Sequence, residues 1–274
     1  MNVKRMIPIA VLLVTIVVLA IVGKGQLSKD VRDKLYDYRY VVHAGGALEC
    51  GNETFSYTNS YEALENLYLY GNRISEFDFL YTSDGEIVCA HNGKETWAEG
   101  FSFREAPTLE EFLNARSFGS FTPMSLSMLA EYMEKHKDLY VVTDVKDDNI
   151  QFCQDVRNKH PKLLSQFIIQ IYHEDEYEPI KRMGFKNIIY TLYRASDDEL
   201  ELENLEAFLN KHDLFGVTFW ESWADETSEF YNMVLTTEVP IFVHTVNEKS
   251  EMEKMFNKGI VGIYTDVVDP LLRY

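Results

Sequence analysis

The sequence predicts an α/β fold, and within that class a (β/α)8 TIM barrel with a small hairpin insertion after the second strand, preceded by an N-terminal hydrophobic helix. From residue 40 onward, eight short apolar segments alternate with longer helical patterns, and no change of composition divides them. A doubly wound parallel sheet would show the same alternation. The count of eight and the uniform composition favour the barrel.

The eight expected strands are short runs rich in β-branched and aromatic residues. They cover residues 40–43, 73–79, 140–144, 167–170, 187–190, 216–219, 241–244 and 261–265. Helical patterns lie between them at residues 60–70, 125–136, 177–183, 197–211, 227–236 and 248–258. We expect residues 85–90 to form the hairpin arm that folds His91 back over the mouth of the barrel.

Several expected helix boundaries coincide with residues that cap helices. Ser60, Ser125 and Asp197 stand at starts, where a side-chain oxygen can accept a hydrogen bond from the first turn. Gly184 and Gly259 stand at ends, where a left-handed residue closes the last turn.

The first 24 residues differ from the rest of the chain. Residues 7–22 are uncharged and apolar apart from Thr15, and at about 1.5 Å per residue they fall slightly short of a hydrocarbon core about 30 Å thick. A signal anchor is favoured over the core of a cleaved secretory signal. We therefore expect a transmembrane segment at 1–24, a stalk at 25–39 and the barrel at 40–274, anchored outside the cytoplasm or secreted after cleavage.

Length, charge and cysteine content narrow the classes of function. The chain has 274 residues, of which 46% are hydrophobic, and the roughly 240 residues after the N-terminal segment can bury a sizeable core. The formal charge of −18 argues against a nucleic-acid partner, because no basic patch would neutralise the phosphates. Cys50, Cys89 and Cys153 are too few for a disulfide framework and are expected to be free thiols. The oligomeric state is not predicted.

Three carboxylates follow neighbouring expected strands. Glu76 and Asp78 lie two residues apart and therefore project from the same face. Asp144, at the end of the next strand, offers a third oxygen ligand. Carboxylates gathered in this way repel one another unless a cation shares them, and oxygen donors suit Ca²⁺ or Mg²⁺ better than zinc. The alternative is a solvated strand end with salt bridges to Lys146 and Arg73.

Two histidines flank the carboxylates: His43 ends the first strand and His91 follows the hairpin arm. A single histidine at a strand end is more often structural, but a pair can supply the base and the acid that phosphodiester cleavage requires. Lys146, two residues beyond Asp144, either binds a phosphate oxygen or acts as a counter-ion. Together these residues predict metal-assisted cleavage of a phosphodiester.

Other polar residues end strands at the same edge, where the active sites of TIM barrels lie. Gln170, Tyr172 and His244 are candidates for binding substrate or phosphate. Asn59, at the start of the first expected helix, either caps that helix or projects into the site.

The order of these motifs resembles the glycerophosphodiester phosphodiesterases, a family within the phosphatidylinositol-specific phospholipase C-like phosphodiesterases. The motifs are HAGG at 43–46, TNSYEA at 58–63, EFD at 76–78, TSDG at 82–85, His91, DVK at 144–146, QIY at 170–172, HTVN at 244–247 and GIYTD at 262–266. The resemblance extends from residue 40 to about residue 270.

The resemblance implies a (β/α)8 barrel that acts on a small-molecule or lipid-derived phosphodiester. It implies that a hydroxyl of the substrate attacks phosphorus and that water then opens the cyclic phosphate. A divalent metal ion, Ca²⁺ or Mg²⁺, would polarise the phosphoryl oxygens and lower the pKa of the attacking hydroxyl. The implied roles are metal ligand for Glu76, Asp78 and Asp144, base for His43, acid for His91 and phosphate ligand for Lys146.

The chain departs from the family pattern at four positions. Ala44 replaces an arginine after the first histidine, which removes a phosphate-binding guanidinium. Asn92 replaces an aspartate, Asp144 a longer glutamate, and His244 an aromatic residue. HAGG in place of HRG, together with QIY and HTVN, resembles a divergent bacterial branch of the family, and the loss of the arginine puts the substrate in question.

Two other functions fit the same residues. One is a phospholipase C- or D-like enzyme acting on intact or lyso phospholipids, which exposed aromatic residues near the barrel mouth would favour, although packing also explains them: Trp97, Phe101, Phe103, Trp220 and Trp223. The other is a non-catalytic barrel that binds a phosphorylated ligand.

Overall fold

The structure is a computed structural model that describes residues 32, 34–91 and 106–268. The chain divides into two compact units, 1–37 and 38–274. In the first unit residues 34–36 are helical. The expected membrane segment lies outside the described residues, and among those described no helix is long and apolar enough to span a bilayer.

Eight parallel strands of the second unit close into a barrel within the described residues, as predicted. The order around the ring is β1, β12, β11, β10, β9, β8, β7 and β4. The ring is closed by the parallel pairing of β4 with β1. Each strand begins and ends within two residues of its prediction. The strands are β1 (Tyr40–Val42), β4 (Ile74–Tyr81), β7 (Tyr140–Val145), β8 (Phe167–Ile171), β9 (Asn187–Thr191), β10 (Gly216–Trp220), β11 (Ile241–His244) and β12 (Gly262–Thr265).

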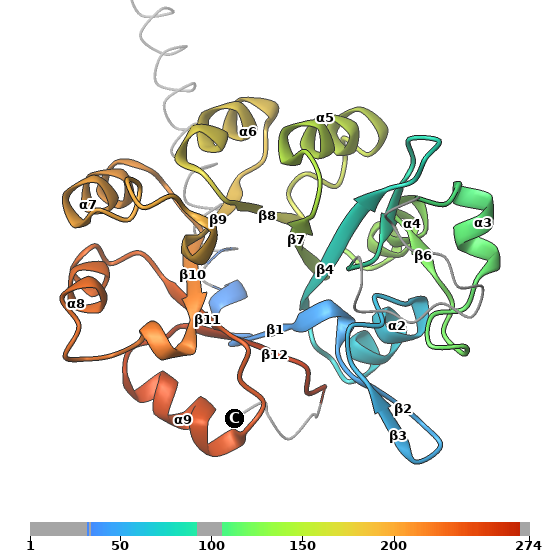
Figure 1. Cartoon of the computed structure of the whole chain (residues 1–274), viewed down its shortest axis with the longest axis horizontal. Helices are drawn as coiled ribbons and strands as arrows, with labels where there is room; N and C mark the ends of the chain where they lie inside the picture. Colours follow the sequence, from blue (N-terminus) through green and yellow to red (C-terminus); the bar gives the residue numbers. More distant parts are fainter. Residues whose placement is uncertain (1–31, 33, 92–105, 269–274) are drawn as a thin grey trace, which may run out of the picture. The chain divides into compact units, whose positions relative to one another are not determined.

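Helices cover the outside of this ring (Figure 1). They are α2 (Tyr61–Leu69), α3 (Leu109–Asn114), α4 (Leu126–Lys135), α5 (Asn149–Lys159), α6 (Tyr177–Met183), α7 (Leu202–Lys211), α8 (Glu229–Thr236) and α9 (Lys249–Asn257). Ser60 and Ser125 cap α2 and α4 as predicted, because their side chains accept from the backbone of Ala63 and Met128. Gly184 closes α6 in the left-handed conformation.

Three helices differ from the predictions. The helix expected from Asp197 begins only at Leu202, because Ser196 and Glu199 cap each other in a separate turn. Glu199 also accepts a hydrogen bond from the backbone of Glu174, a contact distant in sequence. Helices α3 and α5 were not predicted, since α3 is a short helix that buries Phe112 alone and α5 is mostly polar with only one narrow side buried.

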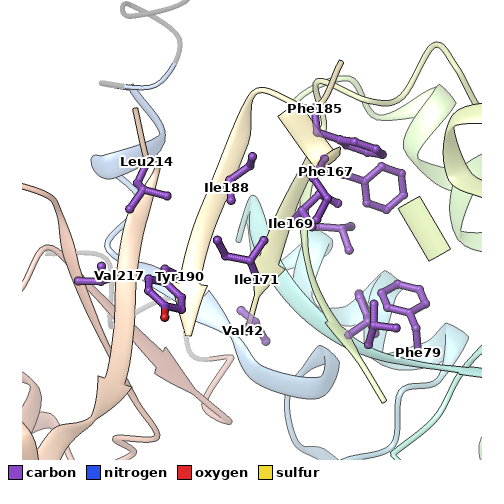
Figure 2. Packing of buried hydrophobic residues seen from close by; sticks show 14 of the residues in the cluster. Val42, Phe79, Phe167, Ile169, Ile171, Phe185, Ile188, Tyr190, Leu214 and Val217 are labelled. Atoms are coloured by element: carbon purple, nitrogen blue, oxygen red, sulfur yellow. The ribbon is translucent and has the colours of Figure 1, made fainter. Parts of the chain in front are cut away.

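Alternation along the strands sends apolar side chains outward and polar ones into the barrel. On β4, Phe77 and Phe79 belong to the hydrophobic cluster between strands and helices, while Glu76 and Asp78 face the interior. On β8 the residues of the cluster, shown in Figure 2, are Phe167, Ile169 and Ile171. The three cysteines are free thiols, as expected.

Two hairpins interrupt the alternation of strands and helices. After Asp78, β4 continues and pairs antiparallel with β5 (Ile87–Cys89), which also pairs with the short β6 (Met124–Ser125). The backbone of Ala90 donates to the carbonyl of Asp78 at 3.0 Å, so the predicted hairpin arm returns His91 to the carboxylates. The hairpin of β2 (Leu48–Cys50) and β3 (Glu53–Phe55) was not predicted, because its residues are mostly exposed and polar.

Gly46 fixes the turn that carries His43. Its backbone N–H donates to the carbonyl of His43 at 2.8 Å, and its φ is +88°. A Cβ at this position would overlap Val268 and lie 2.8 Å from Cγ1 of Val42. The glycine is therefore required by both backbone conformation and space.

We predict that Gly46→Ala destabilises the protein far more than Gly51→Ala. Both glycines have positive φ, which costs an alanine about 1–2 kcal/mol, but a Cβ at Gly51 meets nothing within 4 Å. Overpacking at Gly46 should add about 1–3 kcal/mol. Urea unfolding of both variants measures the difference, and equal losses would contradict the role assigned to Gly46.

Candidate active site

A pocket of about 350 Å³ lies at the C-terminal ends of the barrel strands. Of the site residues expected from the sequence, all except Tyr172 line it. The lining consists of His43, Tyr57, Glu76, Asp78, His91, Asp144, Lys146, Gln170, Tyr193, Arg194, Trp220, His244, Thr245 and Tyr264.

The three carboxylates converge. One oxygen from each of Glu76, Asp78 and Asp144 lies within 4.8 Å of the others. Oε2 of Glu76 accepts from the backbone N–H of Ala44 at 2.8 Å, while its buried Oε1 has no hydrogen-bond partner in the described part of the chain. Burial and the charge of Asp78 raise the pKa of Glu76 to about 8. These oxygen donors, one of them without a partner, fit a hard divalent cation.

Asn59 makes two hydrogen bonds to Asp78, one to its side chain and one to its backbone. Its Nδ2 donates to Oδ2 of Asp78 at 2.9 Å, and its Oδ1 accepts from the backbone N–H of Asp78 at 3.1 Å. Its backbone is left-handed, with φ of 46°, and its N–H donates to the carbonyl of Ala44. Of the two roles the sequence allowed, Asn59 therefore takes the one in the site, and Ser60 caps the helix.

Lys146 lies between two of the carboxylates. Its Nζ is 2.8 Å from Oδ1 of Asp78 and 2.6 Å from Oδ2 of Asp144. Burial alone would lower the pKa of Lys146, but these two charges raise it. The ammonium group is thus charged, and in this structure it is the counter-ion that the sequence allowed as an alternative to a phosphate ligand.

Tyr172 lies behind Asp144 rather than on the pocket wall. Its hydroxyl donates to Oδ1 of Asp144 at 2.7 Å and accepts from the backbone N–H of Val145 at 2.7 Å. Burial would raise the pKa of Asp144, but Lys146 and this hydroxyl lower it. Tyr172 therefore orients a carboxylate that stays ionised.

His43 forms a chain of hydrogen bonds that sequence reasoning did not identify. Its Nδ1 lies 2.8 Å from Oδ1 of Asp266, and Nδ2 of Asn247 donates to the other oxygen at 2.8 Å. Burial would raise the pKa of Asp266, but both hydrogen bonds lower it. An ionised Asp266 only accepts, so Nδ1 of His43 donates and Nε2 lies on the side of Glu76, 4.0 Å from Oε2. Asn247 and Asp266 belong to the HTVN and GIYTD motifs, but their pairing with His43 depends on strand order.

The two histidines have opposite pKa shifts. Burial alone would lower the pKa of His43, but Asp266 and Glu76 raise it to about 9. Burial lowers the pKa of His91. The ring of Tyr57 packs edge-on against both, with centroids 4.7 Å from His43 and 5.3 Å from His91. No sequence signal marked Tyr57, whose backbone is left-handed with φ of 59°.

The opposite wall is aromatic and largely neutral. His244 packs against the rings of Tyr193, Trp220 and Tyr264. Its Nδ1 is 3.2 Å from the hydroxyl of Thr218, and its buried Nε2 has no partner among the described residues. Burial lowers the pKa of His244 to about 3, so the ring is neutral near pH 7.

The remaining candidate positions divide between the pocket, the core and the undescribed chain. Ala44 is fully buried and outside the pocket lining. Trp220 lines the pocket and is 44% exposed, whereas Trp223 packs on Phe219 and Phe230. Outside the described residues lie Asn92, Trp97, Phe101 and Phe103.

We predict that His244 makes the protein less stable in acid. Its pKa falls from 6.5 when unfolded to about 3 when folded, so stability is complete above pH 6.5 and is lost as the pH falls toward 3. At pH 5 the loss should be about 2 kcal/mol. Urea unfolding of wild type and His244→Phe at pH 7 and pH 5, in EDTA, measures this loss. On going from pH 7 to pH 5, wild type should lose more unfolding free energy than the variant, by this amount. Equal losses in the two proteins would contradict the prediction.

Comparison with known proteins supports the fold. No family model matches the chain, and no curated protein matches it in sequence. Solved structures do match. A phosphodiesterase from Oleispira antarctica in complex with the product sn-glycerol-3-phosphate has a TM-score of 0.66 at 16% identity, covering 86% of this chain and 95% of that one.

Two further structures have the same architecture. A glycerophosphodiester phosphodiesterase from Thermotoga maritima has a TM-score of 0.64 at 17% identity, covering 86% of this chain and 97% of that one. A glycerophosphoryl diester phosphodiesterase from Parabacteroides distasonis has a TM-score of 0.63 at 16% identity, covering 88% and 90%. The chain thus has the barrel fold of solved glycerophosphodiester phosphodiesterases, as its motifs led us to expect.

Proposed function

We propose that this chain is a metal-dependent phosphoric diester hydrolase acting on glycerophosphodiesters or related lipid and cell-envelope headgroups. The observation that carries the proposal is the convergence of three carboxylates and two histidines in one pocket. The shared barrel fold supports it, and a solved neighbour contains sn-glycerol-3-phosphate. That ligand is the monoester that hydrolysis of a glycerophosphodiester leaves behind.

Glu76, Asp78 and Asp144 would hold the cation. Their oxygens suit Ca²⁺ or Mg²⁺, and a positive charge beside Glu76 would keep that carboxylate ionised at neutral pH. When bound, the cation would polarise the phosphoryl oxygens and offset the charge of the carboxylates. Asn59 and Tyr172 orient two of these ligands through the hydrogen bonds described above.

His43 is assigned as the base and His91 as the acid. In the neutral ring of His43, Nδ1 donates to Asp266 and the lone pair of Nε2 is free to accept the proton of an attacking hydroxyl. The leaving alcohol would take its proton from His91. The raised pKa of His43 is caused by carboxylates, so a cation held by them would lower it and favour the neutral ring.

The remaining lining residues would position the diester. Gln170 and His244 face the pocket, and Nε2 of His244 offers a neutral hydrogen-bonding group. Lys146 supports the carboxylates in the present geometry. The apolar segment at 7–22 would anchor the barrel outside the cytoplasm, near lipid-derived diesters.

We predict that hydrolysis requires a divalent cation and that the Asp144→Asn variant binds this cation more weakly than wild type. Loss of outer-sphere partners changes metal affinity about 10–100-fold, so loss of a direct ligand should exceed tenfold. A panel of glycerophosphodiesters, lysolipids and inositol lipids, assayed with Ca²⁺, Mg²⁺ or EDTA, tests this. Asp213→Asn, a change at the surface, is the matched control. Absence of turnover with every cation and diester would favour the non-catalytic barrel.

We predict that the leaving group distinguishes the two histidines. His91→Ala should slow hydrolysis of an ordinary glycerophosphodiester about 10²–10⁴-fold. It should retain hydrolysis of a glycerol diester of 4-nitrophenol, whose leaving group needs no acid. His43→Ala should lose both activities, and His173→Ala, at a surface ring, should lose neither. If His43→Ala, and not His91→Ala, retained activity on the 4-nitrophenol diester, His43 would be the acid and His91 the base.

A further inference from the structure

We propose that Arg194, at the end of the short helix η4 (Leu192–Arg194), binds the phosphate of the substrate. This inference rests on the proposed function and assigns a binding residue to the same diester. It follows from the charges of the pocket, from the contacts of the guanidinium and from its distance to the carboxylates.

The pocket is acidic, yet a phosphodiester is an anion. Besides the metal-ligand candidates, the carboxylate of Asp266 lies behind His43. The ammonium group of Lys146 contacts two carboxylates within 2.8 Å, and its side chain is only 19% exposed. Its charge is therefore largely balanced within the protein. Beside the proposed divalent cation, an anionic substrate would bind more tightly to a pocket with a second positive side chain that is less committed to carboxylates than Lys146.

Arg194 carries the less committed cation. The guanidinium lies over the ring of Tyr172, with 4.1 Å from Cζ to the ring centroid. Its Nη1 is 3.8 Å from Oδ1 of Asp144, too far for a hydrogen bond. Among the described residues it makes no hydrogen bond, and its side chain is 42% exposed. Stacking orients a guanidinium while its N–H donors stay available for a bidentate contact with phosphate.

The position of Arg194 matches the place where phosphate would lie. Asp144 is one of the three carboxylates that would hold the cation, and Nη1 of Arg194 is 3.8 Å from it. A phosphate drawn to that cluster would thus come within hydrogen-bond range after a small side-chain movement. Tyr172 links the parts, because its ring supports Arg194 while its hydroxyl orients Asp144.

Arg194 and Ala44 lie on opposite sides of the barrel. A guanidinium at that position would approach the site from the β1 side, but Ala44 is buried and only its N–H contacts the carboxylates. Arg194 comes from the end of β9, across the barrel. The phosphate would therefore be held from the wall that also carries Trp220 and His244.

The test compares Arg194→Gln and Arg194→Lys with Arg182→Gln in the full-length protein. Arg182 is an exposed arginine, 3.8 Å from Glu178, and serves as the matched control. The measurements are KM for a glycerophosphodiester, calorimetric binding of sn-glycerol-3-phosphate at saturating Ca²⁺, and the affinity for Ca²⁺ alone. The third readout separates phosphate binding from support of Asp144.

We expect Arg194→Gln to raise KM and the Kd of sn-glycerol-3-phosphate about 10–100-fold, with Ca²⁺ affinity within about twofold of wild type. Arg194→Lys should lose less, and Arg182→Gln nothing. Unchanged binding in Arg194→Gln, with an active wild type, would overturn this assignment alone. An equal loss of Ca²⁺ affinity would make Arg194 a positioning residue and also overturn it. A wild type that neither hydrolyses diesters nor binds the monoester would overturn the proposed function as well.

Discussion

The burial of Glu76 and Asp78, with Asp144 partly buried beside them where β4 and β7 pair, is the constraint on which the site depends. Charges removed from water must be compensated by partners in good geometry. Glu76 accepts a hydrogen bond from the backbone N–H of Ala44. Asp78 accepts one from Asn59 and pairs with Lys146. Asp144 accepts hydrogen bonds from Lys146 and Tyr172. The left-handed backbones of Ala44 and Asn59, which are hydrogen-bonded to each other, bring these donors into position. Local strain near the site thus serves the compensation of buried charge.

The pocket has two walls of different chemistry. The strands β1, β4 and β7, with the hairpin arm, supply the acidic groups and both histidines, whereas β9, β10 and β11 supply aromatic rings, a neutral histidine and a guanidinium. In the proposed enzyme the first wall would hold the cation and move protons, and the second would recognise the diester.

The sequence predicted the barrel because each strand is a short apolar run whose alternation separates core from interior. It failed where tertiary contacts outweigh local pattern. Helix α5 is polar because only a narrow side of it is buried. The sequence at Ser196 resembles a helix start, but Glu199 there accepts hydrogen bonds from the backbone of Ser196 and of the distant Glu174. The β2–β3 hairpin is mostly exposed, and only Leu48 and Phe55 join a small hydrophobic cluster, so its strands are too short for alternation to be recognised.

By itself, the sequence determined the barrel, the carboxylates that share a face, and the two histidines that flank them, because these follow from alternation along a strand and from motif order. The tertiary structure decided which partners those groups meet. Asp266 reaches His43 because β12 lies beside β1 in the closed ring. Lys146 lies between two carboxylates, Tyr172 lies behind one of them, and Arg194 stacks on the ring of Tyr172 near Asp144. Such pairings depend on which strands are neighbours and on how far a side chain reaches, and no spacing along the chain records either.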